Sequence, residues 1–99
     1  MADRVLMTFE EIAECKRDLQ QKRDEFSQTT ERLNAAIERC AAGWEGAAQV
    51  AFLDRYQSDL LPVFRQTVPD VIDAMNAKLE GAMDAIRQTD QQIAAAFRG

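Results

Sequence analysis

Apolar residues recur every three or four positions along nearly the whole chain, and this spacing constrains the fold more than any other feature of the sequence. In the first half the ladder consists of Phe9, Ile12, Leu19, Phe26, Leu33, Ile37, Cys40 and Trp44, and polar residues interrupt it at Lys16, Arg23 and Thr30. Such spacing places apolar side chains on one stripe of an α-helix, as in a coiled coil. β-Branched residues, which favour strands, are sparse. We therefore predict an all-α fold in a single domain over residues 1–99.

The first helix is predicted to run from about residue 8 to residue 42. Thr8 and Glu11 have the spacing of a capping box, in which each side chain bonds the backbone amide of the other residue. Met7 and Ile12 occupy the two positions of a hydrophobic staple. These signals place the helix start near Thr8.

The second helix is predicted over about residues 47–95, after a turn at residues 43–46. Gly43 is expected to close the first helix in the left-handed conformation that glycine tolerates. Because this connection is short, the two helices should fold back antiparallel. The apolar spacing continues at Phe52, Tyr56, Phe64, Ile72, Leu79, Ile86 and Ile93, with Val68, Met75 and Ala82 at the interleaved positions.

Two prolines interrupt the second helix. Pro62 and Pro69 each remove a helical hydrogen bond and clash with the preceding turn. We favour a continuous helix that bends near residues 62–69. The alternative is a helix that breaks near Thr67 and restarts at Asp70, since these two residues have the spacing of a second capping box.

A turn centred on Trp44 and Glu45 determines which residues of the two helices face each other. The predicted pairs are Ile37 with Phe52, Leu33 with Tyr56, and Phe26 with Val63 or Phe64. The first helix then starts opposite Gly81, which leaves Ile86, Ile93 and Phe97 beyond it unless residues 1–7 cover them. Each helix of a lone hairpin buries only one stripe, so we expect two hairpins to pack as a four-helix bundle.

Charge and composition exclude several classes of function. Twelve Lys and Arg residues against seventeen Asp and Glu residues give a net charge of −5, which disfavours nucleic acid and anionic membranes as partners. The chain has no histidine, the commonest general base and metal ligand. We therefore expect no enzymatic activity, no metal and no cofactor. Lys16 and Arg23 lie on the apolar ladder, where polar residues select register and partner.

The two cysteines are predicted to be free thiols. Cys15 and Cys40 lie on the same helix, roughly 37 Å apart, which is too far for a disulfide within one chain. Cys40 is expected to be a small buried residue and Cys15 to flank the apolar stripe. Two distant thiols without histidine also supply too few ligands for zinc.

Targeting signals are absent from the sequence as read. The first residues lack the basic start and apolar run of a signal peptide, and no stretch approaches 18 apolar residues. On these rules the chain is cytoplasmic, and any export would use a route that reads no cleavable leader.

The Trp-x-Gly motif at mid-chain is the most specific feature. Trp44 and Gly46 form it, Phe52 follows eight residues after the Trp, and Tyr56 four residues later. This pattern resembles the WXG family of small type VII secretion substrates, the ESAT-like proteins, over the whole chain. The resemblance implies an antiparallel hairpin that forms a homodimer, or a heterodimer with a related WXG protein. It also implies export of the folded dimer by the ATPase of a type VII secretion system.

One element of the family pattern is missing. Members or their partners often carry a C-terminal Tyr-x-x-x-Asp/Glu export signal, but the only tyrosine is Tyr56, which Leu60 follows at that spacing. Ile86 and Asp90 have the spacing without the tyrosine, and a role for Ile86 in the helix stripe is the preferred interpretation. The possible export-signal region is formed by Ile86, Asp90, Ile93 and Phe97.

Two alternatives remain open from the sequence. Trp44 either caps the end of the core or stays partly exposed as a binding anchor. The protein is either a secretion substrate or co-secreted adaptor, or a cytoplasmic interaction module that uses the same stripes and is never exported.

Overall fold

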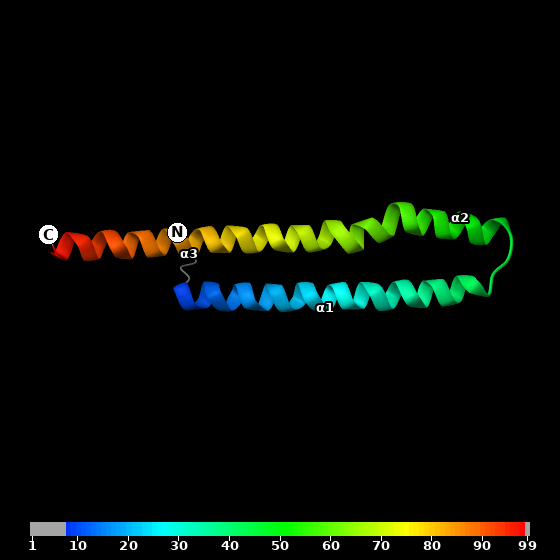
Figure 1. Cartoon of the computed structure of the whole chain (residues 1–99), viewed down its shortest axis with the longest axis horizontal. Helices are drawn as coiled ribbons and strands as arrows, with labels where there is room; N and C mark the ends of the chain where they lie inside the picture. The colour runs from blue at the N-terminus through cyan, green and yellow to red at the C-terminus, as the bar shows by residue number, and fades with distance from the viewer. Residues whose placement is uncertain (1–7, 99) are drawn as a thin grey trace, which may run out of the picture.

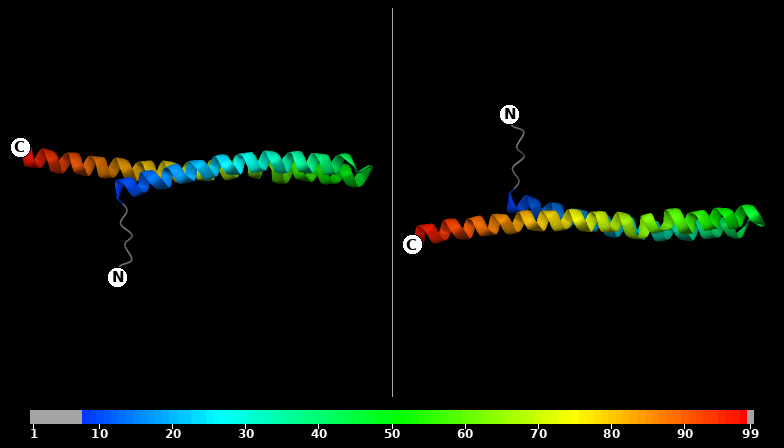
Figure 2. Two further views of the ribbon diagram at one scale, coloured as in Figure 1. Left: turned by 90° about the horizontal axis from the view of Figure 1, so that it is seen from below. Right: turned by 90° about the horizontal axis from the view of Figure 1, so that it is seen from above.

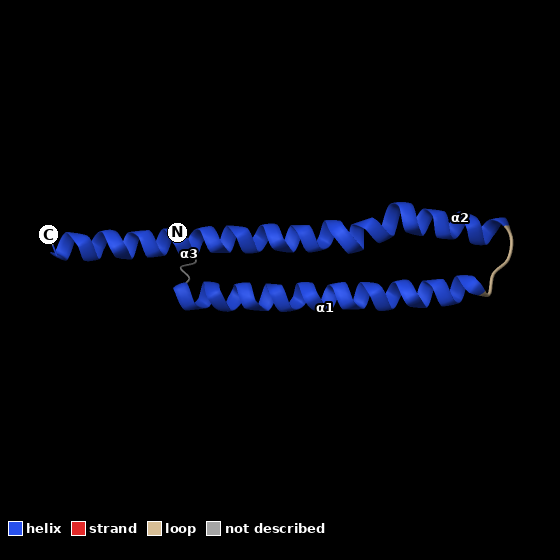
Figure 3. Ribbon diagram, in the orientation of Figure 1, coloured by secondary structure: helices blue, strands red, loops and turns tan. Residues whose placement is uncertain are grey.

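The computed structural model describes residues 8–98 and shows one long helical hairpin (Figure 1). Helix α1 spans Phe9–Ala42, and the second arm consists of α2 (Ala47–Arg55), the π-helical segments η1 (Tyr56–Leu60) and η2 (Val63–Thr67), and α3 (Val68–Arg98). Figure 3 shows that the turn is the one non-helical connection between the arms. The prediction of an all-α, two-helix hairpin is confirmed.

The hairpin is a thin rod. Its principal extents are 77 × 25 × 24 Å, so the molecule is only one layer of paired helices deep. The two further views in Figure 2 show that the C-terminal part of α3 extends past the start of α1. An isolated rod of this shape leaves most of each helix surface without a partner.

The start of α1 has the predicted capping box. The Thr8 hydroxyl oxygen accepts a hydrogen bond from the Glu11 amide at 3.1 Å, and the Thr8 amide donates to Glu11 Oε1 at 3.2 Å. These bonds satisfy amides that have no partner within the helix. Met7, the proposed staple residue, lies outside the described residues. The same holds for all of residues 1–7, which were considered as a cover for Ile86, Ile93 and Phe97.

The prediction for Gly43 was wrong. Gly43 has φ −85° and ψ −3°, which is right-handed, whereas Gly46 has φ 96°. The Trp44 amide donates to the Ala41 carbonyl at 3.0 Å, which closes α1 without a left-handed residue. The chain instead reverses at Gly46, the residue before α2, where a side chain would be strained.

The second arm stays helical from Ala47 to Arg98 and accommodates its prolines by widening. Pro62 comes two residues after the end of η1, and Pro69 two residues after the end of η2. A proline ring clashes with the carbonyl four residues earlier, and in both cases that carbonyl belongs to a π-helical segment. The chain does not break at Thr67, because the wider π turns move these carbonyls aside.

The π segments also change which residues face each other. The Arg87 guanidinium lies 4.9 Å from the ring centre of Phe9, so α1 starts opposite Arg87. The predicted start opposite Gly81 is corrected by about two turns. A π turn takes more residues than an α turn, and the second arm therefore uses more residues to run the length of α1.

The core within one hairpin is small. The buried apolar residues are Ile12, Ala41, Tyr56, Leu61 and Met83. On α3, Pro69 and Met83 are buried while the predicted seam residues Met75 and Ala82 are exposed. The seam toward α1 is thus shifted by one residue at these positions, and part of the apolar stripe of α3 faces outward.

Candidate functional site

An open apolar groove lies beside the turn. Its volume is about 340 Å³, and it is lined by Leu33, Ala36, Ile37, Cys40, Ala41, Trp44 and Phe52. Residues of α1 form one wall, and the turn and α2 supply Trp44 and Phe52. Ile37 and Phe52 were predicted to face each other, and they share this groove. The lining contains almost no polar surface, so it suits an apolar side chain of a partner.

Trp44 stands at the end of the groove with 47% of its surface exposed. Its ring meets Phe52 edge to face, with ring centres 5.3 Å apart, and Phe52 in turn stacks on Tyr56 at 6.5 Å. This row of rings holds the indole in place from one side. Trp44 is therefore a supported but half-open aromatic surface and does not close off the core.

Two further groove residues differ from the predictions. Cys40 is exposed, although a buried thiol was expected. Leu33 is 43% exposed and does not fill the place opposite Tyr56. That place is taken by Asn34, whose Oδ1 accepts a hydrogen bond from the Tyr56 hydroxyl at 2.9 Å. The facing surface of α1 lies one residue further on, which turns Leu33 and Cys40 toward solvent.

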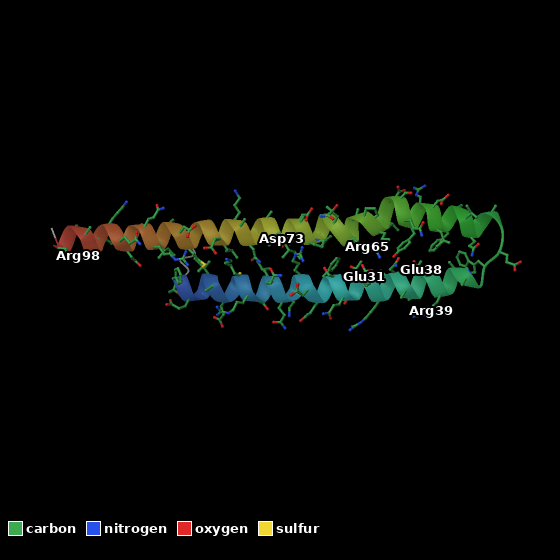
Figure 4. The ribbon with its side chains drawn as sticks, in the orientation of Figure 1. Glu31, Glu38, Arg39, Arg65, Asp73 and Arg98 are labelled. Atoms are coloured by element: carbon green, nitrogen blue, oxygen red, sulfur yellow. The ribbon has the colours of Figure 1, made fainter. Side chains whose placement is uncertain are left out.

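Tyr56 and an adjacent ion pair connect the arms below the groove. The Tyr56 side chain is buried at 3% exposure, and this burial raises the pKa of its hydroxyl. Arg65 donates from Nε to Glu31 Oε2 at 2.9 Å and from Nη2 to Glu31 Oε1 at 2.7 Å. These hydrogen bonds lower the pKa of the Glu31 carboxyl. Figure 4 shows Glu31 and Arg65 directed toward each other between the arms.

The cations predicted on the α1 ladder pair with acids of α3. Lys16 bonds Glu80, and Arg23 Nη2 donates to Asp73 Oδ2 at 3.0 Å. The hydrogen bond from Lys16 is the main cause of the lowered pKa of the Glu80 carboxyl. These pairs align the two arms, so both cations act within the hairpin.

Other predicted seam residues contribute to the hairpin only in part. Phe26 meets Phe64 with ring centres 6.4 Å apart, as one of the predicted pairings requires. Intermediate exposure is common to Phe9, Leu19, Phe26, Ile37, Phe64, Ile72, Leu79 and Ile86, whereas Ile12 is buried. The half-buried residues keep part of their apolar surface exposed in the hairpin.

The residues of the possible export-signal region lie on both sides of Arg87, the residue of α3 opposite the start of α1. Ile86 is half-buried and shares a shallow pocket of about 230 Å³ with Asp90. Ile93 and Phe97 lie further along α3, where they are 52% and 89% exposed. Figure 1 shows this end of α3 projecting alone. The tail, which we define as residues 88–98, therefore presents apolar side chains without contacts from α1.

Sequence reasoning missed the Asn34–Tyr56 hydrogen bond and the Glu31–Arg65 ion pair. The pairing of Phe26 with Phe64 placed Tyr56 near residue 34, and this signal was available. The Glu31–Arg65 pair was harder to find, because the π segments change the facing residues between Tyr56 and Arg65. Both interactions connect the arms and neither is aimed at a ligand.

Within residues 8–98, no set of three or more potential metal-ligating side chains comes together. Over the same range, no helix combines the length and hydropathy needed to cross a bilayer. The groove beside Trp44 and the exposed apolar side chains of the tail are the features that stand out in the described part of the chain.

The comparisons with known proteins agree on one relationship. A family model described as "Proteins of 100 residues with WXG" matches residues 4–98. Protein YukE of Bacillus subtilis (strain 168) is 31% identical over 99 residues, which cover 100% of this chain and 100% of that protein. No solved structure matches the chain.

Proposed function

The chain belongs to the WXG100 family, whose members are non-enzymatic secreted substrates, and on this premise we propose that it leaves the cell as a folded helical dimer through a type VII secretion system. In this role it acts as a substrate, or as an adaptor exported together with a partner. The half-exposed Trp44 at the Trp-x-Gly turn carries the proposal, because a buried tryptophan would offer nothing to bind.

The dimer is supported by the apolar surface that one hairpin leaves open. Apart from Trp44, Phe52 and the tail, large apolar residues with at least two fifths of their surface exposed include Leu33, Leu60, Val63, Val71 and Met75. A monomeric soluble protein rarely exposes so many along one rod. A second hairpin, either an identical chain or a related WXG protein, covers such stripes in a four-helix bundle.

The two ends of the rod have separate roles in this proposal. The groove beside Trp44 lies at the turn, and the tail lies at the opposite end (Figure 1). The tail is read by the secretion ATPase in place of the missing Tyr-x-x-x-Asp/Glu signal. An amphipathic helix can bind by laying its apolar face into a groove of the receiver, and Ile93 and Phe97 suit this mode.

Replacing Trp44 with Ala tests the role of the groove. We expect the variant to keep its helical circular dichroism and its dimer, because the indole is half exposed, and to lose export into the culture medium. Val50→Ala is the matched control, since Val50 is also an exposed apolar residue of this end but does not line the groove. Unchanged export of the Trp44 variant would reject recognition through this residue, and unfolding would make Trp44 structural.

The missing tyrosine signal supports one other candidate function. A hairpin with the same open stripes can serve as a cytoplasmic interaction module that is never exported. Detection of the protein in the medium of cells with an intact type VII ATPase, and its absence from the medium when that ATPase is deleted, favours the secretion substrate. Retention inside the cell in both strains favours the module.

A further inference from the structure

A second stripe on α1 borders the hairpin seam and shares Phe26 with it, since Phe26 meets Phe64 of the second arm. In the later half of α1, Thr30, Asn34 and Ile37 face the second arm. Thr30 is buried, and Asn34 accepts a hydrogen bond from Tyr56. The neighbouring face is formed by Cys15, Leu19, Lys22, Phe26, Thr29, Leu33, Ala36 and Cys40, which recur at alternating intervals of four and three residues. We call this set the outer stripe. Leu33 and Cys40 are exposed on it, and both also line the groove beside Trp44.

The two cysteines lie near opposite ends of the outer stripe. They are 25 residues apart, which is close to seven turns at about 3.6 residues per turn, so both thiols lie on the same face of α1. The midpoint between them falls between Ser27 and Gln28. A two-fold axis at that midpoint would place Cys15 of one chain opposite the partner's Cys40. The same axis pairs Leu19 with Ala36, Lys22 with Leu33, and Phe26 with Thr29, so every stripe position meets another stripe position.

Charges along the free edge of the outer stripe favour the same arrangement. Asp18 and Glu25 lie on this edge in the first half of α1, and Arg32 and Arg39 lie on it in the second half. The axis that pairs the cysteines brings Asp18 beside the partner's Arg39 and Glu25 beside the partner's Arg32, each two residues from the position directly opposite. Opposite charges flanking an apolar seam set the orientation of paired helices.

These edge charges are available to a second chain. Asp18 and Glu25 lie 3.9 and 3.7 Å from Lys22 of their own helix, and Glu25 Oε2 also accepts a hydrogen bond from Gln21 Nε2 at 3.1 Å, so neither acid pairs with the second arm. Arg32 and Arg39 form no ion pair with any residue in the range 8–98. Figure 4 shows Arg39 on the side of α1 that faces away from the second arm. The complementary charges identify a second copy of this chain as the occupant of the outer stripe.

We propose that two copies pack antiparallel through the outer stripe and that Cys15 of each chain forms a disulfide with Cys40 of the other after export. This inference rests on the proposed dimer and assigns a register and a covalent modification to it. Packed helices have axes about 8–10 Å apart and Cα atoms about 2.3 Å off the axis, which allows facing Cα atoms the roughly 4.4–6.8 Å of a disulfide.

The oxidant is a low-molecular-weight disulfide such as oxidised glutathione. The thiolate of one cysteine attacks it, which forms a mixed disulfide and releases one reduced thiol. The thiolate of the facing cysteine then attacks the protein sulfur of the mixed disulfide and releases the second reduced thiol. Each bridge thus oxidises two protein thiols and reduces one small disulfide to two thiols. Outside the cell such bridges persist, whereas the cytoplasm keeps them reduced.

The direct test uses the full-length protein treated with oxidised glutathione. Native mass spectrometry with reductant first shows whether the chain forms a dimer. Peptide mapping of the oxidised protein should then find the Cys15 peptide linked to the Cys40 peptide. A reduced dimer that yields no such link overturns this register and leaves the proposed dimer intact, whereas a monomer overturns both.

Two single-cysteine variants sharpen the result. Neither Cys15→Ser nor Cys40→Ser should form a covalent dimer alone, because each bridge needs one cysteine of each kind. An equimolar mixture of the two variants should regain cross-linking, with one bridge in each mixed dimer. Cross-linking of either variant alone, at the rate of the unmodified chain, would show a different interface.

Charge exchange tests the register without cysteine chemistry. Glu25→Arg should weaken the reduced dimer several-fold, since it lies beside the partner's Arg32, and the double variant Glu25→Arg/Arg32→Glu should restore it. Asp54→Arg is the matched control, because Asp54 is an exposed acid on α2, away from the outer stripe. Equal weakening in the control, or no restoration in the double variant, contradicts the proposed pairing.

Discussion

Tyr56 combines apolar packing with a hydrogen bond between the arms. Its ring stacks on Phe52, which supports Trp44, and its hydroxyl bonds Asn34. A buried hydroxyl without a partner would cost free energy, so the contribution of the Tyr56 hydroxyl to stability depends on the hydrogen bond to Asn34. Tyr56 thus links the support of the groove to the alignment of the two arms.

Replacing Tyr56 with Phe removes this hydrogen bond and keeps the ring. We expect the free energy of unfolding to fall by about 0.5–1.5 kcal/mol, measured by urea denaturation. The double variant with Asn34→Ala should cost less than the sum of the two single variants, since both remove the same bond. Full additivity would show that the two side chains do not interact.

Met83 and Leu33 should respond differently to truncation. Met83 is 6% exposed within the hairpin, and Met83→Ala should lower the free energy of unfolding by about 2–5 kcal/mol at any protein concentration. Leu33 is exposed in the hairpin, so Leu33→Ala should mainly weaken the dimer. Native mass spectrometry and denaturation at several concentrations separate the two effects. Equal losses of hairpin stability would contradict the observed difference in burial.

At the scale of elements, ion pairs align α1 with the second arm. Lys16, Arg23 and Glu31 of α1 reach three separate partners along its length. The arms contact each other along a narrow seam, and the polar pairs penalise a shift of one arm along the other. We infer that they contribute more to register than to stability, as exposed ion pairs usually contribute little.

Stability should therefore depend on pH in the acidic range. The pKa values of Glu31 and Glu80 are lowered in the folded chain, from 4.5 in both cases, by hydrogen bonds from Arg65 and Lys16. A carboxyl with a lowered folded pKa stabilises the fold above its unfolded pKa, and this contribution is lost as the pH falls through the lower folded value. We expect the denaturation midpoint to fall below pH 4.5.

The control for this prediction is the double variant Glu31→Gln/Glu80→Gln. It cannot ionise at these positions, so its denaturation midpoint should change less between pH 6 and pH 3, which bracket the ordinary range of glutamate. An identical pH dependence in both proteins would assign the acid response to other carboxyls.

At the scale of the whole molecule, the overhang of α3 decides what the rod can offer a receiver. Helical residues that pack against nothing have low local stability. The tail nevertheless keeps Ile93 and Phe97 on a helix, which preserves a surface for docking. Either a secretion component or a second hairpin is the partner that this surface suits.

Deleting residues 88–99 distinguishes these two partners. If the tail is read by the secretion machinery, we expect export to stop while the dimer and its melting temperature remain. The double variant Ile93→Ser/Phe97→Ser should behave in the same way, and Gln91→Ser/Gln92→Ser should be exported as a control. Loss of the dimer in the truncated chain would instead place Ile93 and Phe97 in the bundle core.

The sequence alone predicts the features that depend on neighbouring residues. Helical spacing, the capping box at Thr8 and the glycines around Trp44 were sufficient for an all-α hairpin with a mid-chain turn. The Phe26–Phe64 contact followed from the position of that turn. These features are local, since hydrogen bonds and steric limits within a few residues determine them.

Only the tertiary structure decided which side of each helix faces inward. The left-handed conformation fell on Gly46 instead of Gly43. The π segments before Pro62 and Pro69 changed the residue that lies opposite the start of α1 from Gly81 to Arg87. Apolar spacing marks a stripe that is wider than one helix contact, so it cannot distinguish the seam within a hairpin from a surface meant for a second chain. Asn34 and Met83 took seam positions, and Leu33, Cys40 and Met75 were left outside the seam. The reason is that the path of the second arm around α1 depends on the packing of residues far apart in the sequence.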